Sequence, residues 1–416
     1  MNNGTETSPI STKDRIVSLD IIRGFALFGI LLVNIPLFQS PGLIHDLYLI
    51  SPELSKTDQF LRMLLDVFVE TKFFTIFSLL FGVGFYIFMN RAEEKTGRFY
   101  RLFSRRLLVL ALFGFLHLVL FWYGDILLRY ALAGFLLIFF YKRKEKTILI
   151  WLLSFTIVMI ILLSLSFFSS ADSVDQQITS LQTEGVMKVE EAIEVYQNGS
   201  YVEWLSFRFS SEVIPVLLNV PFNIITSLYM FLIGLYVAKR GVFHNFPVHK
   251  NFVKRVWFYS FFISIPISTG IILLHLRILD FGVLNSQMIE SLLMISGLSL
   301  SFVYVSTILL LLQKAIWKRL LHPLRYIGRM ALTNYIFQTL IGVGLFVGIG
   351  PYGEINLRIG IMISLIVFPL QILGSYLWLK YFRYGPLEWV WRTLTYRSLR
   401  KSAAKMNTGK DSSTIL

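Results

Sequence analysis

The chain has 416 residues, of which 55% are hydrophobic and only 15% are charged, and its formal net charge is +14. A soluble domain usually has about a quarter of its residues charged, so this composition excludes a soluble globular protein and predicts an all-α, polytopic membrane protein. The chain contains no cysteine, which excludes disulfides, thiolate metal sites and a thioester bound to the enzyme. The positive charge is typical of cytoplasmic loops and does not point to nucleic-acid binding.

Ten apolar segments are each long enough to cross about 30 Å of hydrocarbon. The predicted spans are 20–39, 62–89, 105–122, 125–141, 147–169, 214–238, 254–275, 287–312, 330–349 and 358–380. No small-residue cleavage site follows the first segment, so it is predicted to be a retained span and not a signal peptide.

These spans define the predicted domain organisation. A cytoplasmic segment over 1–19 precedes one transmembrane helical domain over 20–382. A basic, aromatic helix over 383–401 is predicted to lie on the inner leaflet, and 402–416 read as a disordered tail.

The basic residues fix the predicted orientation. They gather in five segments, 91–106, 142–146, 239–255, 314–329 and 383–401, which all fall on one side if there are ten spans. The positive-inside rule makes that side cytoplasmic, with both termini in the cytosol. The acidic loop 170–213 then lies outside the cytoplasm, and its middle, 186–197, can form a short surface helix.

His117 and Asp125 stand eight positions apart in an almost entirely apolar stretch. Titratable groups inside hydrocarbon are costly, so they usually have a partner or a function. The orientation places His117 about 17 Å above the cytoplasmic start of its span, and Asp125 begins the next span just beyond the turn at Gly124. The histidine could simply form a hydrogen bond between helices, or it could be a catalytic base oriented by the aspartate.

Other polar residues are predicted at depths compatible with an inward-facing substrate cavity. They are Asn34, Asp66, Glu70, Lys72, Asn334 and Gln338. For the lysine, the alternative is an ion pair with one of the two acids. For the amides, the alternative is hydrogen bonding between helices.

The cytoplasmic mouth has a different character, because arginines gather there beside small residues. Arg23, Arg105, Arg106 and Arg329 are predicted near Gly82 and Gly84. Guanidinium groups suit phosphate recognition, so the mouth could hold the phosphates of a large anionic cosubstrate. The alternative is that these arginines anchor helix ends at lipid headgroups, with Arg23 paired to Asp20. The sequence has no Walker loop, no dinucleotide-binding motif and no spacing of zinc ligands. No metal is therefore predicted, and an ATP-driven pump or a metalloprotease is unsupported.

Five segments resemble the YeiB-like family of bacterial inner-membrane proteins, which is catalogued as a domain of unknown function. They are RIVSLDIIRGFALFGILLVNI, KFFTIFSLLFGVGF, RRLLVLALFGFLHLVLFWYGDILLRYALAG, GRMALTNYIFQT and YGPLEWVWRTLTY. The opening segment also resembles a wider group of transmembrane acyltransferases, which move an acyl group from cytosolic acyl-CoA to an acceptor across the membrane. One branch of that group often has a histidine at the end of the first span. This chain has Asn34 there, which cannot act as a base, so His117 would take the role.

The resemblance implies a transmembrane acyltransferase with acetyl-CoA or another acyl-CoA as cosubstrate. Arg23, Arg105 and Arg106 would hold its phosphates, beside Gly82 and Gly84. The acceptor would be an envelope glycan, a lipid-linked sugar or a small extracytoplasmic molecule. Membrane lipids are the other expected partner, and a homodimer is left open. The alternatives are a proton-coupled secondary transporter, with His117 and Asp125 as a relay, and a non-catalytic membrane protein.

Overall fold

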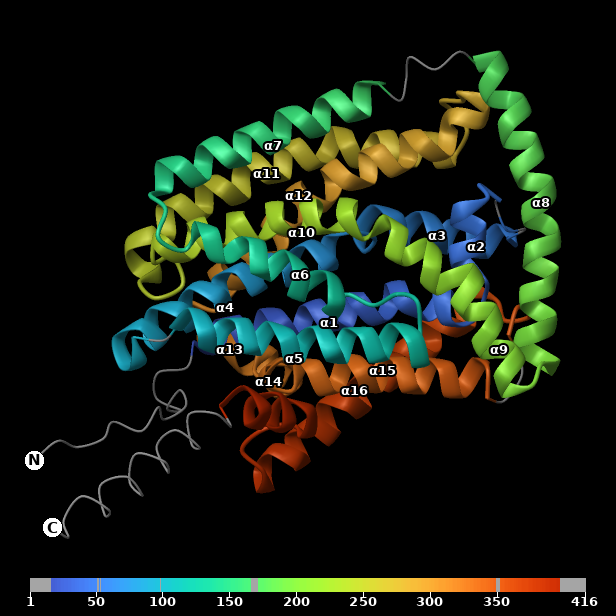
Figure 1. The fold of residues 1–416 in the computed structure, drawn as a ribbon. Coiled ribbons are helices and arrows are strands. Elements are labelled where there is room, and N and C mark those ends of the chain that lie inside the picture. The colour runs from blue at the N-terminus through green and yellow to red at the C-terminus, as the bar shows by residue number, and fades with distance from the viewer. Residues whose placement is uncertain are drawn as a thin grey trace, which may run out of the picture.

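The computed structural model describes residues 16–50, 52, 54–97, 99–165, 171–348 and 352–396. Within these ranges the chain forms helices, turns and irregular connections and no strand, which confirms the predicted all-α class. Most of the long helices run alongside one another in a bundle (Figure 1). The predicted tail over 402–416 and most of the N-terminal segment lie outside the described residues.

The helices take their labels from chain order. They are α1 (Val17–Phe38), α2 (Gly42–Leu47), α3 (Lys56–Phe68), α4 (Lys72–Thr96), α5 (Phe99–Leu120), α6 (Leu127–Leu137), η2 (Ile138–Phe140), α7 (Glu145–Leu165), α8 (Ala171–Asn198), α9 (Tyr201–Arg208), η3 (Phe209–Val213), α10 (Ile214–Lys239), α11 (Phe246–His275), η4 (Gly282–Leu284), α12 (Asn285–Leu311), α13 (Ala315–Leu321), α14 (Leu324–Arg329), α15 (Ala331–Phe346) and α16 (Leu357–Tyr381). A further helix covers 386–396, inside the predicted basic, aromatic helix.

Seven helical stretches of the described chain are long and apolar enough to cross a membrane. They are Val17–Phe38, Lys56–Glu94, Phe99–Leu120, Tyr201–Lys239, Phe246–His275, Asn285–Leu311 and Leu357–Tyr381. The apolar helices Leu127–Phe140 and Ala331–Phe346 are shorter. Each of the ten predicted segments contains a helix, and the chain is a multi-pass membrane protein.

The structure corrects two details of the predicted elements. The second predicted span is not continuous, because α3 ends at Phe68 and α4 begins at Lys72. Thr71 in the break has a positive φ of 67°, and its hydroxyl donates to the carbonyl of Leu293 at 2.8 Å on another helix. The short helix predicted over 186–197 in the acidic loop is instead part of the longer helix α8, which has 28 residues. A helix of this length can pack its apolar face against the end of the bundle.

The five basic segments lie at one end of the bundle, called here the basic end. Lys142 pairs with Glu93, and Arg240 Nε lies 2.9 Å from Glu145 Oε2. Arg329 donates to the carbonyl of Arg383 at 3.4 Å, and the Trp391 indole donates to the carbonyl of Arg106 at 2.8 Å. These contacts bring all five basic segments together, as the distribution of basic residues along the sequence predicts.

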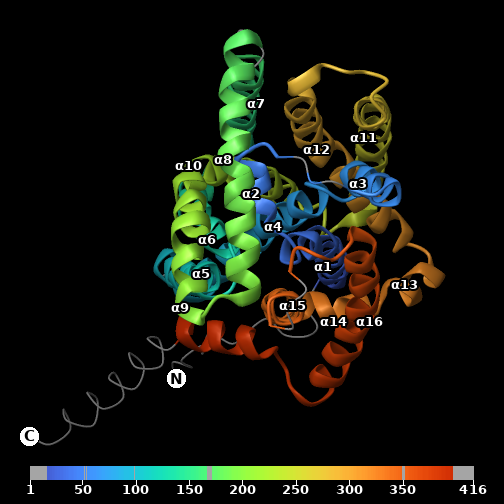
Figure 2. The same cartoon turned by 90° about the vertical axis from the view of Figure 1, so that its right-hand side faces the viewer.

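The opposite end, called here the α8 end, is covered by α2, α8 and α9. Figures 1 and 2 show α8 crossing this end roughly at right angles to the long helices. Tyr196 on α8 stacks on Tyr352 with ring centroids 4.2 Å apart. The Gln197 side-chain amide donates to the main-chain carbonyl of Tyr352 at 2.8 Å. The two ends of the bundle therefore have distinct structures.

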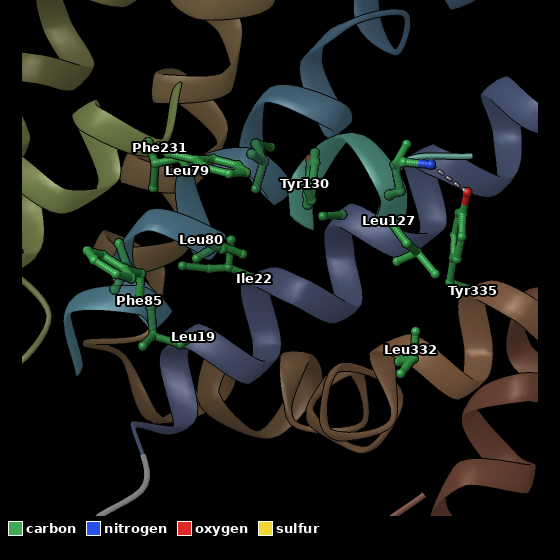
Figure 3. Close-up of a cluster of buried hydrophobic side chains, with 14 of the residues drawn as sticks. Leu19, Ile22, Leu79, Leu80, Phe85, Leu127, Tyr130, Phe231, Leu332 and Tyr335 are labelled. Carbon is green, nitrogen blue, oxygen red and sulfur yellow. Dashed lines mark hydrogen bonds between the residues drawn. The ribbon is translucent and has the colours of Figure 1, made fainter. Parts of the chain in front are cut away.

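The core of the bundle is built around α1, which packs against α4, α12, α14, α15 and α16. Figure 3 shows part of this core, where Leu19 and Ile22 of α1 lie near Leu80 and Phe85 of α4. The crossing of α4 and α10 depends on Gly82, because a Cβ there would lie 2.1 Å from the Phe231 carbonyl oxygen. Small residues at such crossings let helix backbones approach closely.

Candidate functional site

His117 is held between two partners near the α8 end of the bundle. It lies in the last turn of α5, and Asp125 follows in the connection before α6. Its Nδ1 is 3.0 Å from Asp125 Oδ1, and its Nε2 is 2.9 Å from the Thr339 hydroxyl on α15. His117 and Thr339 are each 1% exposed and Asp125 is 8% exposed. The predicted His–Asp pair is therefore present, and a threonine 222 positions from the histidine completes it.

The hydrogen-bond chemistry assigns the protons of this group. When the Asp125 carboxylate is ionised it only accepts, and Nδ1 of His117 is then the donor. For a neutral imidazole, Nε2 is then the acceptor and the Thr339 hydroxyl is the donor. This Asp–His–hydroxyl order is the arrangement in which a carboxylate fixes the tautomer of a catalytic histidine.

Tyr335 and a helix cap hold the connection that carries Asp125. The Tyr335 hydroxyl accepts from the Ile126 amide at 3.3 Å, drawn as a dashed line in Figure 3, and donates to the Gly124 carbonyl at 3.0 Å. The second oxygen of Asp125 accepts from the Leu128 amide at 2.6 Å, as expected of an aspartate at a helix N-terminus. The carboxylate is thus fixed on both oxygens.

A cavity of about 340 Å³ opens beside Asp125, and we call it the outer cavity. Two of the predicted cavity residues, Asn34 and Glu70, line it together with the predicted catalytic residue Asp125. Arg129 and Asn223 also line it, and the sequence reasoning missed both. Arg129 had a usable signal, because an arginine one turn into an apolar span is itself costly.

The other predicted cavity residues have different roles. Asp66 pairs with Arg62 at 3.0 Å and with His275 at 2.9 Å. The Lys72 ammonium donates to the Asp66 carbonyl at 2.6 Å. None of these groups lines the outer cavity, whereas Glu70 does.

The two predicted amides are hydrogen-bonded within the bundle. Asn334 donates to the Ser375 hydroxyl at 2.9 Å, and Gln338 donates to the Gln371 side-chain oxygen at 3.0 Å. These bonds join α15 to α16. Neither amide lines the outer cavity, so the geometry agrees with the alternative of hydrogen bonding between helices.

A second cavity of about 340 Å³ opens at the basic end, and we call it the inner cavity. Its cationic lining residues are Arg23, Arg91, Arg106, Arg329 and Arg392. Gly84 also lines it, and a Cβ at this position would lie 3.5 Å from an Arg23 guanidinium nitrogen. Arg105 and Gly82 were predicted here, but neither is part of the wall. Gly82 instead serves the helix crossing described above.

Aromatic packing explains which of two adjacent arginines faces this cavity. The Arg106 guanidinium lies 3.9 Å above the Trp391 ring and 5.1 Å from that of Phe88. Trp391 belongs to the helix over 386–396, so this helix closes one side of the cavity. Sequence spacing alone could not select Arg106 over Arg105, because the choice depends on a contact 285 positions away.

The two cavities meet at the connection between α5 and α6. Ile126 lines both of them. On the inner side its neighbours include Tyr130 and Tyr335, and on the outer side Gly124 and Asp125. The segment that carries the aspartate is therefore the partition between a cationic cavity at one end and a polar cavity at the other.

A multi-pass helical membrane protein with two cavities and a buried His–Asp pair, of which the aspartate lines the outer cavity and the histidine lines neither, is the class that this fold and site define. Residues 237–398 match the family described as "Protein of unknown function (DUF418)". The chain is 35% identical to the uncharacterized protein YxaH of Bacillus subtilis, over 95% of this chain and 98% of that one. It is 34% identical to an uncharacterized 39.9 kDa protein of Bacillus acidopullulyticus, over 93% of this chain and 96% of that one.

The chain belongs to the DUF418 family, and the sequence-based assignment to the YeiB-like proteins is confirmed. It is 29% identical to the uncharacterized protein YeiB of Escherichia coli, over 94% of this chain and 99% of that one. No solved structure matches the chain.

Proposed function

We propose that the protein is a transmembrane acyltransferase with ten spans and its basic end in the cytosol of a bacterial inner membrane. Acyl-CoA binds at the inner cavity, and the acyl group passes to an acceptor in the outer cavity. The observation that carries the proposal is that the two cavities share Ile126 as a common wall. A group transferred between them crosses one short segment instead of the whole membrane.

The inner cavity supports the cosubstrate because of its charge. Five arginines line it, and the guanidinium group matches phosphate oxygens in geometry and charge. The Tyr384 hydroxyl in the same wall is buried without a hydrogen-bond partner, so it has a donor to offer. Gly84 leaves room beside Arg23. Arg105 stays a predicted phosphate contact that the geometry does not favour.

The transfer step uses His117 as the base. His117 Nε2 takes the proton of the acceptor hydroxyl or amine while the acceptor oxygen or nitrogen attacks the thioester carbonyl. The tetrahedral intermediate then expels the CoA sulfur, which takes the proton from the imidazolium. Asp125 stabilises the charged ring in between. Because Nε2 is bonded to Thr339 in the resting structure, that bond opens before the histidine reaches the acceptor.

The second candidate is a proton-coupled secondary transporter. The observation that favours it is the burial of the His117–Asp125 pair, with both ring nitrogens already bonded, as in a proton relay. A transporter requires the partition at Ile126 to open to each side in turn. A non-catalytic role, in which the pair only joins helices, is the third candidate.

Binding of acyl-CoA tests the proposal directly. Acetyl-CoA is titrated by calorimetry into purified wild-type protein and into the variants Arg106→Gln, Arg105→Gln and Arg101→Gln. We expect the first variant to weaken binding about tenfold, the scale of one lost charge-assisted hydrogen bond. Arg101 is exposed on the same helix and is the charge-matched control. Added salt should weaken binding to the wild type.

Two results of this titration would contradict the proposal. Absence of binding to well-folded wild-type protein at millimolar acetyl-CoA would reject the transferase and favour the transporter. Equal loss in all three variants would mean that CoA responds only to the general positive charge of the basic end and not to the inner cavity.

A further inference from the structure

The outer cavity contains two buried donors that have no acceptor. Arg129 Nε and Trp122 Nε1 are buried without a hydrogen-bond partner, and both side chains line this cavity. Trp122 is 4% exposed. A buried donor without an acceptor costs about 1–3 kcal/mol, and more when it is charged. The cavity therefore presents an unmet requirement for a hydrogen-bond acceptor.

No salt bridge of 4.0 Å or less is found for Arg129 among the described residues, although the Asp125 carboxylate is near enough to act on its charge. The Arg129 guanidinium lies over the Phe74 ring at 4.1 Å, and that ring covers one face of the charged group. Asp125 is already engaged by His117 and by the Leu128 amide. Glu70 lines the same cavity, but no ion pair of 4.0 Å or less joins it to Arg129. The positive charge is thus available to a ligand.

We infer that the outer cavity binds a molecule bearing an oxyanion, a phosphate or a carboxylate, which Arg129 and Trp122 hold by their N–H groups. A guanidinium group with one face on an aromatic ring keeps its edge free for such a bidentate contact. The amides of Asn34 and Asn223 and the carboxylate of Glu70 line the same space. They suit hydroxyl or amino groups on the rest of the ligand.

The inference deepens the proposed function and rests on it for one point, that this molecule is the acyl acceptor. Asp125 lines the cavity together with Arg129, four residues further along the chain. An acceptor anchored by its anionic group at Arg129 places its remaining hydroxyl or amino groups toward the His117–Asp125 pair. The acceptor class is therefore an anionic alcohol or amine, either soluble or carried on a lipid headgroup.

The test uses probes of known charge on the full chain. Wild-type protein in neutral detergent is titrated with inorganic phosphate, glycerol 3-phosphate and phosphatidylglycerol, with glycerol and diacylglycerol as uncharged counterparts that lack the phosphate. We expect saturable binding of at least one anion and of neither counterpart. Binding of glycerol 3-phosphate would assign a soluble ligand, and binding of phosphatidylglycerol alone would assign a lipid headgroup.

Three variants locate the site. Arg129→Gln should raise the Kd of the bound anion at least tenfold, and Arg129→Lys should keep part of the affinity because it keeps the charge. Arg358→Gln removes an exposed arginine near the start of α16 and should leave the Kd unchanged. Wild-type protein that binds none of the anions, or an Arg129→Gln variant that binds as tightly as wild type, would overturn the inference.

Acetyl-CoA binding separates this inference from the proposed function. Arg129→Gln should bind acetyl-CoA as wild type does, because Arg129 does not line the inner cavity. If acetyl-CoA fails to bind while an anion binds in an Arg129-dependent way, the transferase is rejected and the anion site stands. If acetyl-CoA binds but no anion does, the anion site is rejected and the transferase stands.

Discussion

At the scale of single residues, the proposed function depends on how the His117 ring is held. A carboxylate bonds Nδ1 and a hydroxyl bonds Nε2, so the ring has one tautomer and one orientation. The Tyr335 ring centroid lies 5.2 Å from that of the imidazole and limits its rotation. A histidine that only joined two helices would not require an acid fixed on both oxygens beside it.

Activity of single and double variants tests whether His117 and Asp125 act as a unit. His117→Gln should lower transfer from radiolabelled acetyl-CoA by about a hundredfold or more, because the general base is lost. Asp125→Asn removes the charge that stabilises the imidazolium ion and should also impair transfer strongly. The double variant should be little worse than His117→Gln alone.

The control for this prediction is acetyl-CoA binding, which all three variants should retain. Multiplicative losses in the double variant would mean that the two residues work separately. Full activity in His117→Gln would reject the mechanism and leave the histidine with a structural role.

Thr339 gives a prediction that does not depend on activity. Thr339→Val keeps the shape but leaves Nε2 of His117 buried without a donor, which should cost about 1–3 kcal/mol of stability. Thr339→Ser keeps the hydroxyl and should cost less. Thermal unfolding in detergent gives the comparison, and a valine variant as stable as the serine variant would show that Nε2 does not need this partner.

The sequence predicted the His117–Asp125 contact but not the threonine. The pair lies eight positions apart at a tight connection between adjacent helices, so chain geometry alone brings the two together. Thr339 is 222 positions from the histidine, and nothing local to it suggests a role. For the same reason Arg106 could not be separated from Arg105, because Trp391 makes the selection.

At the scale of elements, the end of α5 is clamped by the segment before α10. Arg208 is 1% exposed, and its guanidinium donates to the carbonyls of Leu118 and Val119 at 2.9 and 3.0 Å. Helix ends leave such carbonyls without intrahelical partners. Glu212 accepts from Arg208 Nε at 2.9 Å, so a buried ion pair fixes the turn that carries His117.

Stability measurements on this ion pair test the clamp. Arg208→Met leaves the Glu212 carboxylate buried and unpaired, which should cost about 3–5 kcal/mol. The double variant Arg208→Met, Glu212→Gln removes both charges and should recover part of that loss, because the glutamine can still accept from the Tyr196 hydroxyl that bonds Glu212. A single variant as stable as the double variant in thermal unfolding would show that the charge pair does not secure this end of α5.

Element positions were predictable where hydrophobicity alone decides them, as in α1 and α12. The break between α3 and α4 was not predictable, because apolar residues continue on both sides of it. What stabilises the break is the Thr71 hydrogen bond to the Leu293 carbonyl on α12, a tertiary contact. The length of α8 was also missed, because its apolar residues are sparse and depend on the bundle end for burial.

At the scale of the whole molecule, the charge distribution and the two cavities give one orientation. The inner cavity opens among the arginines of the basic end, and the outer cavity opens toward the α8 end, where Tyr123 accepts from the Leu43 amide of α2 at 3.1 Å. The positive-inside rule predicts that the basic end lies in the cytosol. Under the proposed function, cytosolic acyl-CoA then meets the inner cavity, and the acceptor meets the outer one.

Cysteine labelling tests this orientation, and a chain without native cysteine needs no background substitutions. Met187 on α8 is 62% exposed, and Lys144 is exposed in the connection before α7 at the basic end. In whole cells an impermeant maleimide should label Met187→Cys and spare Lys144→Cys, because only the α8 end faces outward. After the membrane is permeabilised both should label, which controls for reactivity. Labelling at 144 but not at 187 in intact cells would show that the orientation is the reverse of the predicted one. The arginine-lined cavity would then open outside the cytosol, and acyl-CoA could not be its ligand.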